Sequence, residues 1–158
     1  MAAVYRVAPL KAGEIEAAFP LAYACLGTPD LETWRETVRR FADHDESGLV
    51  AAERDGYIRG LLAYSVLPSV SGRQVLVVQS LGVLELLFPE RAALALVDAV
   101  KAIARTSNCD EIVFAVAQDS GWLSTLLSDH AWQDAGRLMV GHQPVMVDNR
   151  YHGHRRGA

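Results

Sequence analysis

A helix placed between two apolar β-runs constrains the fold of this chain more than any other feature. Residues 89–106, "PERAALALVDAVKAIART", are apolar on most of the helical circumference, so this helix must pack on a sheet. The runs on either side of it, residues 73–88 and 109–117, have the composition of buried strands. A helix that connects two strands in this way is a crossover, so we expect the two strands to be parallel.

Three β-rich runs precede this helix and predict an antiparallel meander. Residues 49–56 and 57–68 are separated by the pair Asp55-Gly56, which is a strong signal for a tight hairpin. A third run, residues 73–88, is too long for an ordinary strand. Gly82 within it predicts a β-bulge or a place where another part of the backbone approaches closely.

The remaining elements are shorter. Apolar residues spaced by three and four predict a helix within residues 28–45, with Thr28 or Asp30 as its N-cap. Pro20 is expected to kink or divide the helical segment at residues 12–26, in which it lies. The other expected elements are a strand at 4–9, a helix at 12–26, a helix at 120–132 and a last strand at 135–148.

Composition limits the class of protein. The chain has 158 residues, of which 51% are hydrophobic, enough for one domain that we place at residues 1–148, followed by a flexible tail at 149–158. A net charge of −4 argues against a nucleic-acid partner. No apolar run reaches the ~20 residues that cross a bilayer, and no targeting segment is evident, so we expect a cytoplasmic protein without a membrane partner.

The two cysteines, Cys25 and Cys109, lack the spacing of metal ligands or of a redox pair. Half-buried thiols in a reducing compartment are the expected state, with a disulfide as the alternative. No histidine cluster supplies a supported ligand set, so we expect no metal.

The element order is therefore β-α-α-β-β-β-α-β-α-β over about residues 4–147. This α/β (α+β) arrangement, a mixed central sheet of about six strands with flanking helices, resembles the GNAT superfamily of acyl-CoA-dependent N-acyltransferases. The resemblance lies in element order and spacing more than in motif letters.

The resemblance implies a cofactor site at the start of the helix at 89–106. The superfamily pattern V-x-P-x-x-[QR]-x-x-G-x-[GA] places its hydrophobic position at Leu86, its proline position at Phe88 and its Gln/Arg position at Arg91. Leu94 and Leu96 stand where the pattern has small residues. The residues implied to bind the pyrophosphate of acetyl-CoA or another acyl-CoA are Leu86, Leu87, Phe88, Arg91, Ala92, Ala93, Leu94 and Ala95.

Leu94 also interrupts a stripe of charged residues on its helix, formed by positions 90, 98, 101 and 105. It is either an incidental exposed leucine or part of a contact surface. In the cofactor register, its branched side chain would stand where the pyrophosphate is expected.

A second superfamily signature lies on the next helix and is matched poorly. Its Asn, Ala and Tyr positions fall on Ser120, Leu123 and Leu127. The tyrosine that protonates the departing thiolate in many members is therefore absent. Because CoA thiolate is a good leaving group, water can take that role.

Glu85 is the candidate general base, since the superfamily often carries a glutamate near the end of this strand. Its leucine neighbours would raise its pKa if the side chain entered the cleft. The alternative is a carboxylate that faces solvent or pairs with an arginine, and Glu53 is a weaker candidate with the same alternative. Tyr23, Trp34 and Tyr64 are the acceptor-pocket candidates, each with a core role as its alternative.

Two functions remain from the sequence. One is transfer of an acyl group, normally acetyl, to a primary amine of a small molecule or a protein. The other is a GNAT-like binding or dimerisation module whose acyl-CoA site has decayed. The apolar last strand could pair across a homodimer interface in either case.

Overall fold

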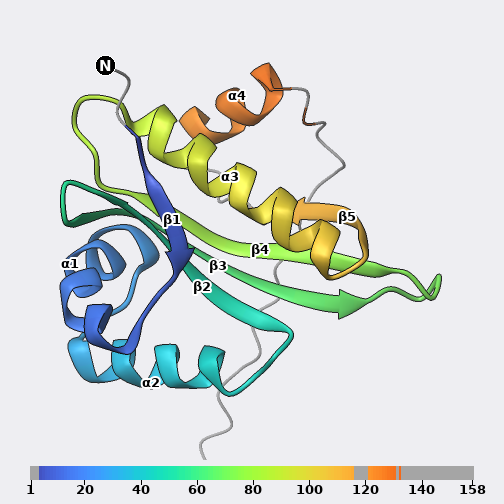
Figure 1. The fold of residues 1–158 in the computed structure, drawn as a ribbon, viewed down its shortest axis with the longest axis horizontal. Helices are drawn as coiled ribbons and strands as arrows, with labels where there is room; N and C mark the ends of the chain where they lie inside the picture. Colours follow the sequence, from blue (N-terminus) through green and yellow to red (C-terminus); the bar gives the residue numbers. More distant parts are fainter. Residues whose placement is uncertain (1–3, 116–120, 131, 133–158) are drawn as a thin grey trace, which may run out of the picture.

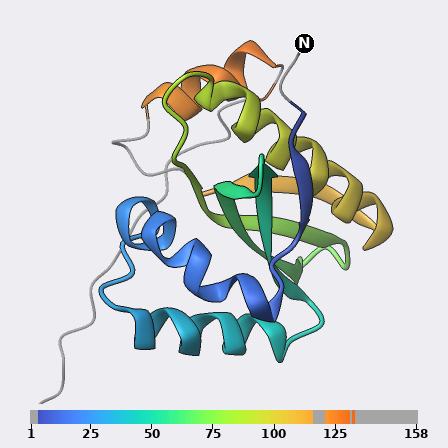
Figure 2. The same ribbon diagram turned by 60° about the vertical axis from the view of Figure 1, so that its left-hand side comes forward.

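A computed structural model describes residues 4–115, 121–130 and 132 of the chain. Helices cover both faces of one mixed sheet, with α1 and α2 on one face and α3 and α4 on the other (Figures 1 and 2). The strands are β1 Arg6–Pro9, β2 Ser47–Arg54, β3 Tyr57–Pro68, β4 Gln74–Val83 and β5 Cys109–Phe114. The helices are the 3₁₀ turn η1 Ala12–Glu14, α1 Ile15–Leu26, α2 Leu31–Ala42, α3 Pro89–Thr106 and α4 Gly121–Asp129.

The sheet follows chain order, β1-β2-β3-β4-β5. Its first four strands are antiparallel and β4 pairs with β5 in parallel, which confirms the predicted crossover through α3. The fold class and the meander are therefore confirmed. Five of the six expected strands belong to the described residues, and the one expected at 135–148 lies outside them.

The β2–β3 hairpin turns at the predicted pair. Asp55 and Gly56 both have positive φ, 55° and 80°, which is the backbone that a tight turn of this hand requires. The hairpin tip lies at the same end of the sheet as the end of β4, because Val83 pairs with Gly60 near the start of β3. Residues far apart in sequence meet at this end.

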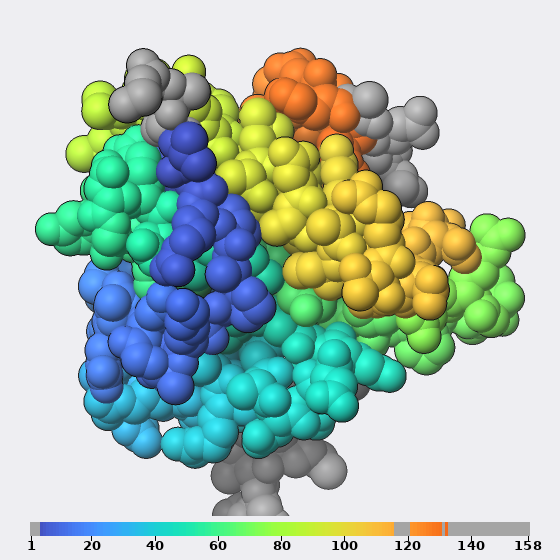
Figure 3. Space-filling view, viewed as in Figure 1, coloured from blue at the N-terminus to red at the C-terminus, as the bar shows by residue number. Residues whose placement is uncertain are grey.

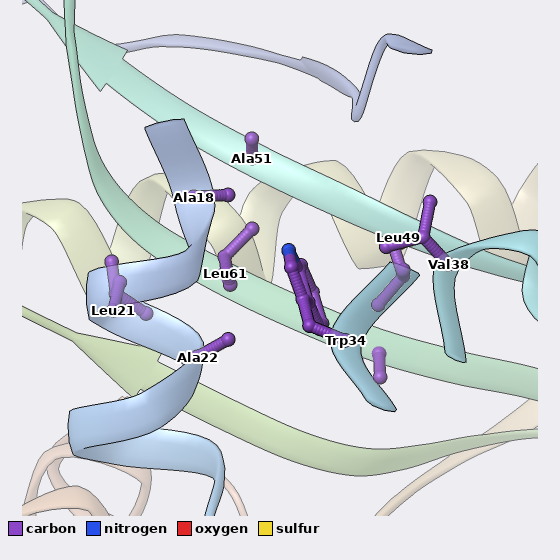
Figure 4. Close-up of a cluster of buried hydrophobic side chains, with 9 residues drawn as sticks. Ala18, Leu21, Ala22, Trp34, Val38, Leu49, Ala51 and Leu61 are labelled. Atoms are coloured by element: carbon purple, nitrogen blue, oxygen red, sulfur yellow. The ribbon is translucent and has the colours of Figure 1, made fainter. Parts of the chain in front are cut away.

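The core on the first face is built around Trp34 of α2, which is only 1% exposed (Figure 4). Its indole N–H donates to the Ile15 carbonyl of α1 over 2.8 Å, so the buried polar atom is satisfied. Asp30 caps α2 by accepting from the Thr33 N–H at 2.7 Å, as predicted. α1 runs through Pro20 as one helix, so the predicted division there is wrong. The buried side chains of α1, Ala18, Leu21 and Ala22, lie on both sides of Pro20 and hold its two halves on the same face of the sheet.

The core on the second face lies under α3, whose ridge runs beside β1 in Figure 3. Leu96 of α3 is fully buried, and its Cδ1 atom lies 2.9 Å from where a Cβ of Gly60 would be. The glycine in β3 therefore makes room for the leucine. No helix in the described ranges is long and apolar enough to cross a membrane.

Two strand predictions need correction. β4 ends at Val83 instead of reaching Phe88, and residues 84–88 form a loop in which Leu86 is 96% exposed. The strand stops because its pairing with β3 ends at Gly60. β5 was expected to be covered on both faces, but Val113 is 44% exposed, and among the described residues β5 is an edge strand.

Gly82 is a position where α1 packs closely on the sheet. A Cβ at residue 82 would lie 2.5 Å from the Cβ of Cys25, which cannot move without the helix. We therefore predict that Gly82→Ala lowers the free energy of unfolding by about 1–3 kcal/mol, the usual cost of overpacking. Chemical denaturation measures this.

Gly13 supplies the matched control, because a Cβ there would meet nothing within 4 Å. Gly13→Ala should leave the free energy of unfolding unchanged or raise it slightly. Equal effects of the two substitutions would contradict the close packing at Gly82.

Candidate functional site

The described pairing of β4 with β5 ends beside a β-bulge in β4. Tyr64 of β3 pairs with Val78 of β4, but Ala63 pairs with Ser80, so Gln79 is an extra residue in the backbone register. Its side-chain Nε2 donates to Ser65 Oγ of β3 at 2.8 Å. The last β4–β5 pair joins Val78 to Phe114, and the next amide, that of Ala115, donates to the Val78 carbonyl over 3.0 Å. Residues 79–83 of β4 continue past this point, and the residues that follow Ala115, 116–120, lie outside the described ranges.

The bulge can be read in the side-chain pattern of β4. Leu76 and Val78 face α3, and the next residues on that face are Leu81 and Val83. From Val78 to Leu81 the same face recurs after three residues, whereas side chains on one face of a regular strand recur after two. The sequence predicted a bulge or a close backbone approach at Gly82. The close approach is confirmed at Gly82, and the bulge lies three positions earlier, at Gln79.

A pocket of about 280 Å³ lies against the bulge on the α1–α2 face. Gln79 and Ser80 of β4 form one side, and the α1–α2 connection, residues 27–29, forms another. The rest of its lining is apolar or carries hydroxyl groups and comes from the two helices and neighbouring strands: Leu26, Thr33, Trp34, Thr37, Phe41, Leu49 and Ala63. Gln79 therefore borders this pocket and directly follows the last described β4–β5 pair.

The first turn of α3 lies at the end of the sheet where β4 ends and the β2–β3 hairpin turns (Figure 1). Phe88 is the N-cap and provides no side-chain hydrogen bond, and Pro89 occupies the first helical position. Helix N-termini present unpaired N–H groups and partial positive charge, which suit an anion. Arg91 is exposed, and its guanidinium carbon stacks 4.7 Å from the centre of the Phe88 ring. A positive side chain is thus held beside this helix start.

The implied cofactor residues divide into two groups. Leu86, Leu87, Phe88 and Arg91 are exposed around the start of α3, where a ligand could reach them. The others face the protein: Ala92 and Ala93 are fully buried, and Leu94 and Ala95 are partly buried. A ligand could contact the second group through their backbone only where the helix start exposes it.

Leu94 and Leu96 occupy different places from those their sequence positions suggested. Leu94 packs with the cluster that joins α3 to α4, which contains Leu123, Leu126 and Leu127, so it belongs to a contact surface. Leu96 is buried against Gly60 on the sheet. Neither leucine is an exposed side chain at the tip of the helix.

Glu85 is pinned at the end of β4 by residues from the opposite side of β3. Its Oε2 atom accepts a hydrogen bond from the Tyr5 hydroxyl and forms a salt bridge with Arg54 Nη2, both at 3.0 Å. Arg54 Nη1 also lies 3.3 Å from the Tyr5 hydroxyl, and the Leu87 amide lies 3.5 Å from Glu85 Oε1. The Glu85 side chain is 3% exposed. We call Tyr5, Arg54 and Glu85 the anchor cluster.

The anchor cluster sets the direction of the pKa shift at Glu85. Burial raises the pKa of the carboxyl. The Tyr5 hydrogen bond, the Leu87 amide and the charges of Arg54 and Arg59 together lower that pKa by more, so it lies below the ordinary value. The rise was predicted only for a side chain in the cleft, and the structure shows the alternative, in which Glu85 points toward β1 and β2 and pairs with Arg54. Its role as a base stays a prediction. Glu53 pairs with Arg6 at the surface.

The three aromatic acceptor candidates do not meet. Trp34 contributes to the lining of the 280 Å³ pocket, as part of the core. Tyr64 lies on the α3 face of the sheet, where it lines a separate hollow of about 620 Å³ near the end of β1. Tyr23 is 62% exposed on α1, with its ring 6.1 Å from that of Phe19. Sequence reasoning missed Gln79, Ser80, Thr33 and Thr37, which carry no motif.

The second signature and the metal prediction fall partly outside the described residues. Leu123 and Leu127 are buried under α3, and Ser120 is not among the residues described. Cys25 and Cys109 are free thiols. In the described ranges no three His, Cys, Asp or Glu side chains gather as metal ligands.

Known structures share this architecture at low sequence identity. An aminoglycoside N-acetyltransferase, AAC(6')-Iy, in complex with CoA superposes with a TM-score of 0.79 at 14% identity over 91% of this chain and 97% of that one. A ribosomal-protein-alanine N-acetyltransferase from Brucella melitensis biovar Abortus 2308 gives 0.74 at 18% identity over 89% and 100%. A transcriptional regulator from Bacillus halodurans C-125 gives 0.77 at 13% identity over 89% and 100%. No family model and no curated protein matches the sequence.

The chain thus has the fold of the GNAT superfamily. The end of the described β4–β5 pairing, the bulge and the start of α3 are the parts of that fold that make up the candidate site. The identities of 14% and 18% to the two acetyltransferases leave the donor and the acceptor to be argued from the geometry.

Glu85 should make stability depend on pH. Its folded-state pKa is below the unfolded value of about 4.3, so its stabilisation is complete above that pH and is lost as pH falls through the lowered pKa. We predict that Glu85→Gln lowers the free energy of unfolding by about 1–3 kcal/mol at pH 7, the cost of unsatisfied buried partners. Urea titrations from pH 3 to pH 7 should show the difference from wild type shrinking below about pH 4. A constant difference would contradict this account of the Glu85 pKa.

Proposed function

We propose that this protein is an acyl-CoA-dependent N-acyltransferase that moves an acyl group, normally acetyl, to a primary amine of a small molecule or a protein. One observation carries the proposal. At Gln79 the end of β4–β5 pairing, the bulge and the 280 Å³ pocket coincide. A thioester that enters beside residues 79–83 and an amine that enters through the pocket would meet there.

The end of the described β4–β5 pairing suits the pantetheine arm of an acyl-CoA. That arm contains two amide groups, which can pair with a strand edge as an added strand does. Residues 79–83 of β4, which follow the last described β4–β5 pair, would provide that edge. The pyrophosphate would then lie at the start of α3, where Arg91 and the first helical N–H groups provide positive charge.

The reaction needs a free-base amine as nucleophile, a polarised thioester carbonyl and the transfer of one proton from the amine nitrogen to the departing thiolate. Backbone N–H groups along the bulged strand can stabilise the oxyanion that forms on the carbonyl. An amine bound as the free base attacks without help, and water can take its surplus proton and protonate the thiolate. Glu85 stays a predicted base, but its carboxylate already accepts a hydrogen bond from Tyr5 and pairs with the charge of Arg54.

The pocket lining favours an acceptor with an apolar body. Trp34, Phe41 and Leu49 supply apolar surface, while Thr33 and Ser80 supply hydroxyl groups. Among the residues that line it, none carries a charge. An uncharged wall also favours the neutral form of the amine, which is the reactive one.

One observation supports the alternative, a decayed module used for binding or dimerisation. Leu86 and Leu87 expose apolar side chains beside the proposed cofactor site, and such groups mark contact surfaces. A homodimer and a cytoplasmic location remain proposals. The second is compatible with two free thiols and a chain without a membrane-spanning helix in its described part.

Titration with acetyl-CoA tests the donor site. We predict micromolar, saturable binding by isothermal calorimetry, weakened at least about tenfold by Arg91→Glu, because a positive charge beside the pyrophosphate becomes negative. ATP should bind far more weakly, because it lacks the pantetheine arm.

Arg105 provides the control for this charge reversal. It is an exposed arginine in the last turn of the same helix, so Arg105→Glu should keep the wild-type affinity. No acetyl-CoA binding up to millimolar concentration would move the assignment to the decayed module.

Blocking the pocket should affect the acceptor alone. We predict that Thr33→Trp, which fills space beside Gln79, raises the KM for an amine acceptor at least about tenfold and leaves the acetyl-CoA affinity unchanged. A panel of primary aryl and alkyl amines, followed by thiol release, identifies the acceptor. Glu36→Trp on the same helix but outside the pocket is the control, and an equal loss in both variants would contradict the acceptor assignment.

A further inference from the structure

The anchor cluster joins three segments that meet at one end of the sheet. Tyr5 lies just before β1, Arg54 ends β2, and Glu85 begins the loop that connects β4 to α3. The Glu85 side chain has three polar contacts. The two at 3.0 Å come from Tyr5 and Arg54, and the one within its own loop, to the Leu87 amide, is longer at 3.5 Å. The loop is therefore tied to the rest of the molecule chiefly by this carboxylate.

The other contacts of the loop are few. The Leu84 amide donates to the Arg59 carbonyl over 2.8 Å, and the Arg91 amide donates to the Phe88 carbonyl over 3.1 Å. Between these two bonds the apolar side chains of Leu86 and Leu87 face solvent and give no packing energy. Glu85 is the buried residue in this stretch.

The charges of the cluster fit an anchoring role. Arg54 and Arg59 bring two positive charges against one carboxylate, and both guanidinium Nε atoms are buried without a hydrogen-bond partner among the described residues. Removing the carboxylate would leave the Arg54 guanidinium, which is 16% exposed, without its buried ion-pair partner, and only the exposed Asp55 at 3.5 Å would remain. The loop would have to move to bring water or another acceptor to it.

We infer that Glu85 is a positioning residue: with Arg54 and Tyr5 it fixes the β4–α3 loop, and so sets how tightly the start of α3 holds the pyrophosphate of acyl-CoA. This inference rests on the proposed donor site. Glu85 then controls the affinity for acyl-CoA. Tyr5 and Arg54, which lie outside the loop, contribute to that affinity by holding Glu85. The partners of Glu85 lie across β3, on the side of β4 away from β5, so the carboxylate does not reach the reacting atoms.

The experiment compares four proteins: wild type, Glu85→Gln, Tyr5→Phe and Glu36→Gln. Tyr5→Phe removes a single hydroxyl group and carries the smallest risk of misfolding. Glu36→Gln breaks the exposed ion pair to Arg40 on α2 and is the matched control. Amide hydrogen exchange by NMR is measured without ligand, and acetyl-CoA affinity, kcat and KM are then measured on the same samples.

We expect the amides of Leu84 and Arg91 to exchange at least about tenfold faster in Glu85→Gln and several-fold faster in Tyr5→Phe, with the amides of α2 unchanged. The acetyl-CoA Kd should rise at least about fivefold in Glu85→Gln, while kcat changes by less than about threefold and its pH profile keeps its position. Glu36→Gln should match wild type in every measurement.

Two results would overturn the inference. Unchanged exchange at Leu84 and Arg91 in Glu85→Gln would show that the carboxylate does not hold the loop. A kcat loss of about a hundredfold or more with unchanged acetyl-CoA affinity would make Glu85 a base. If wild type binds no acetyl-CoA, the proposed function fails and so does the cofactor role, whereas the exchange measurement still decides whether the cluster holds the loop.

Discussion

The extra residue in β4 is the constraint on which the rest of this structure depends. Because side chains alternate along a strand, one inserted residue reverses which face every later side chain takes. With the insertion at Gln79, Leu81 and Val83 face α3 and Gly82 faces α1. Without it, the two apolar side chains would crowd the α1 face and the glycine would lie under α3. The bulge thus serves the packing of both helical layers.

The departures from the superfamily pattern are accommodated elsewhere in the molecule. Leu96 stands where that pattern has a small residue, and Gly60 in β3 gives its side chain room. Leu94 extends the contact between α3 and α4. These leucines are therefore explained by packing and do not by themselves close the donor site. The unusual feature that remains is the exposed loop with Leu86 and Leu87.

The sequence predicts the fold better than the site. Periodicity and turn residues locate the meander, the hairpin at Asp55-Gly56 and the crossover helix, because each depends on local geometry or on one buried face. The end of β4 was misjudged because Leu84, Leu86 and Leu87 look like strand residues, whereas their exposure depends on where β3 stops pairing. The partners of Glu85 were missed for a similar reason: Tyr5 and Arg54 are 80 and 31 positions away, and the sequence contains no local sign of them.

The most direct test of the account is a crystal structure of the protein with acetyl-CoA or a non-hydrolysable analogue. The account predicts the pantetheine arm beside residues 79–83 of β4, the thioester next to Gln79 and the pyrophosphate at the start of α3 near Arg91. A ligand bound elsewhere would contradict it. So would a structure at saturating ligand in which side chains fill the space beside residues 79–83.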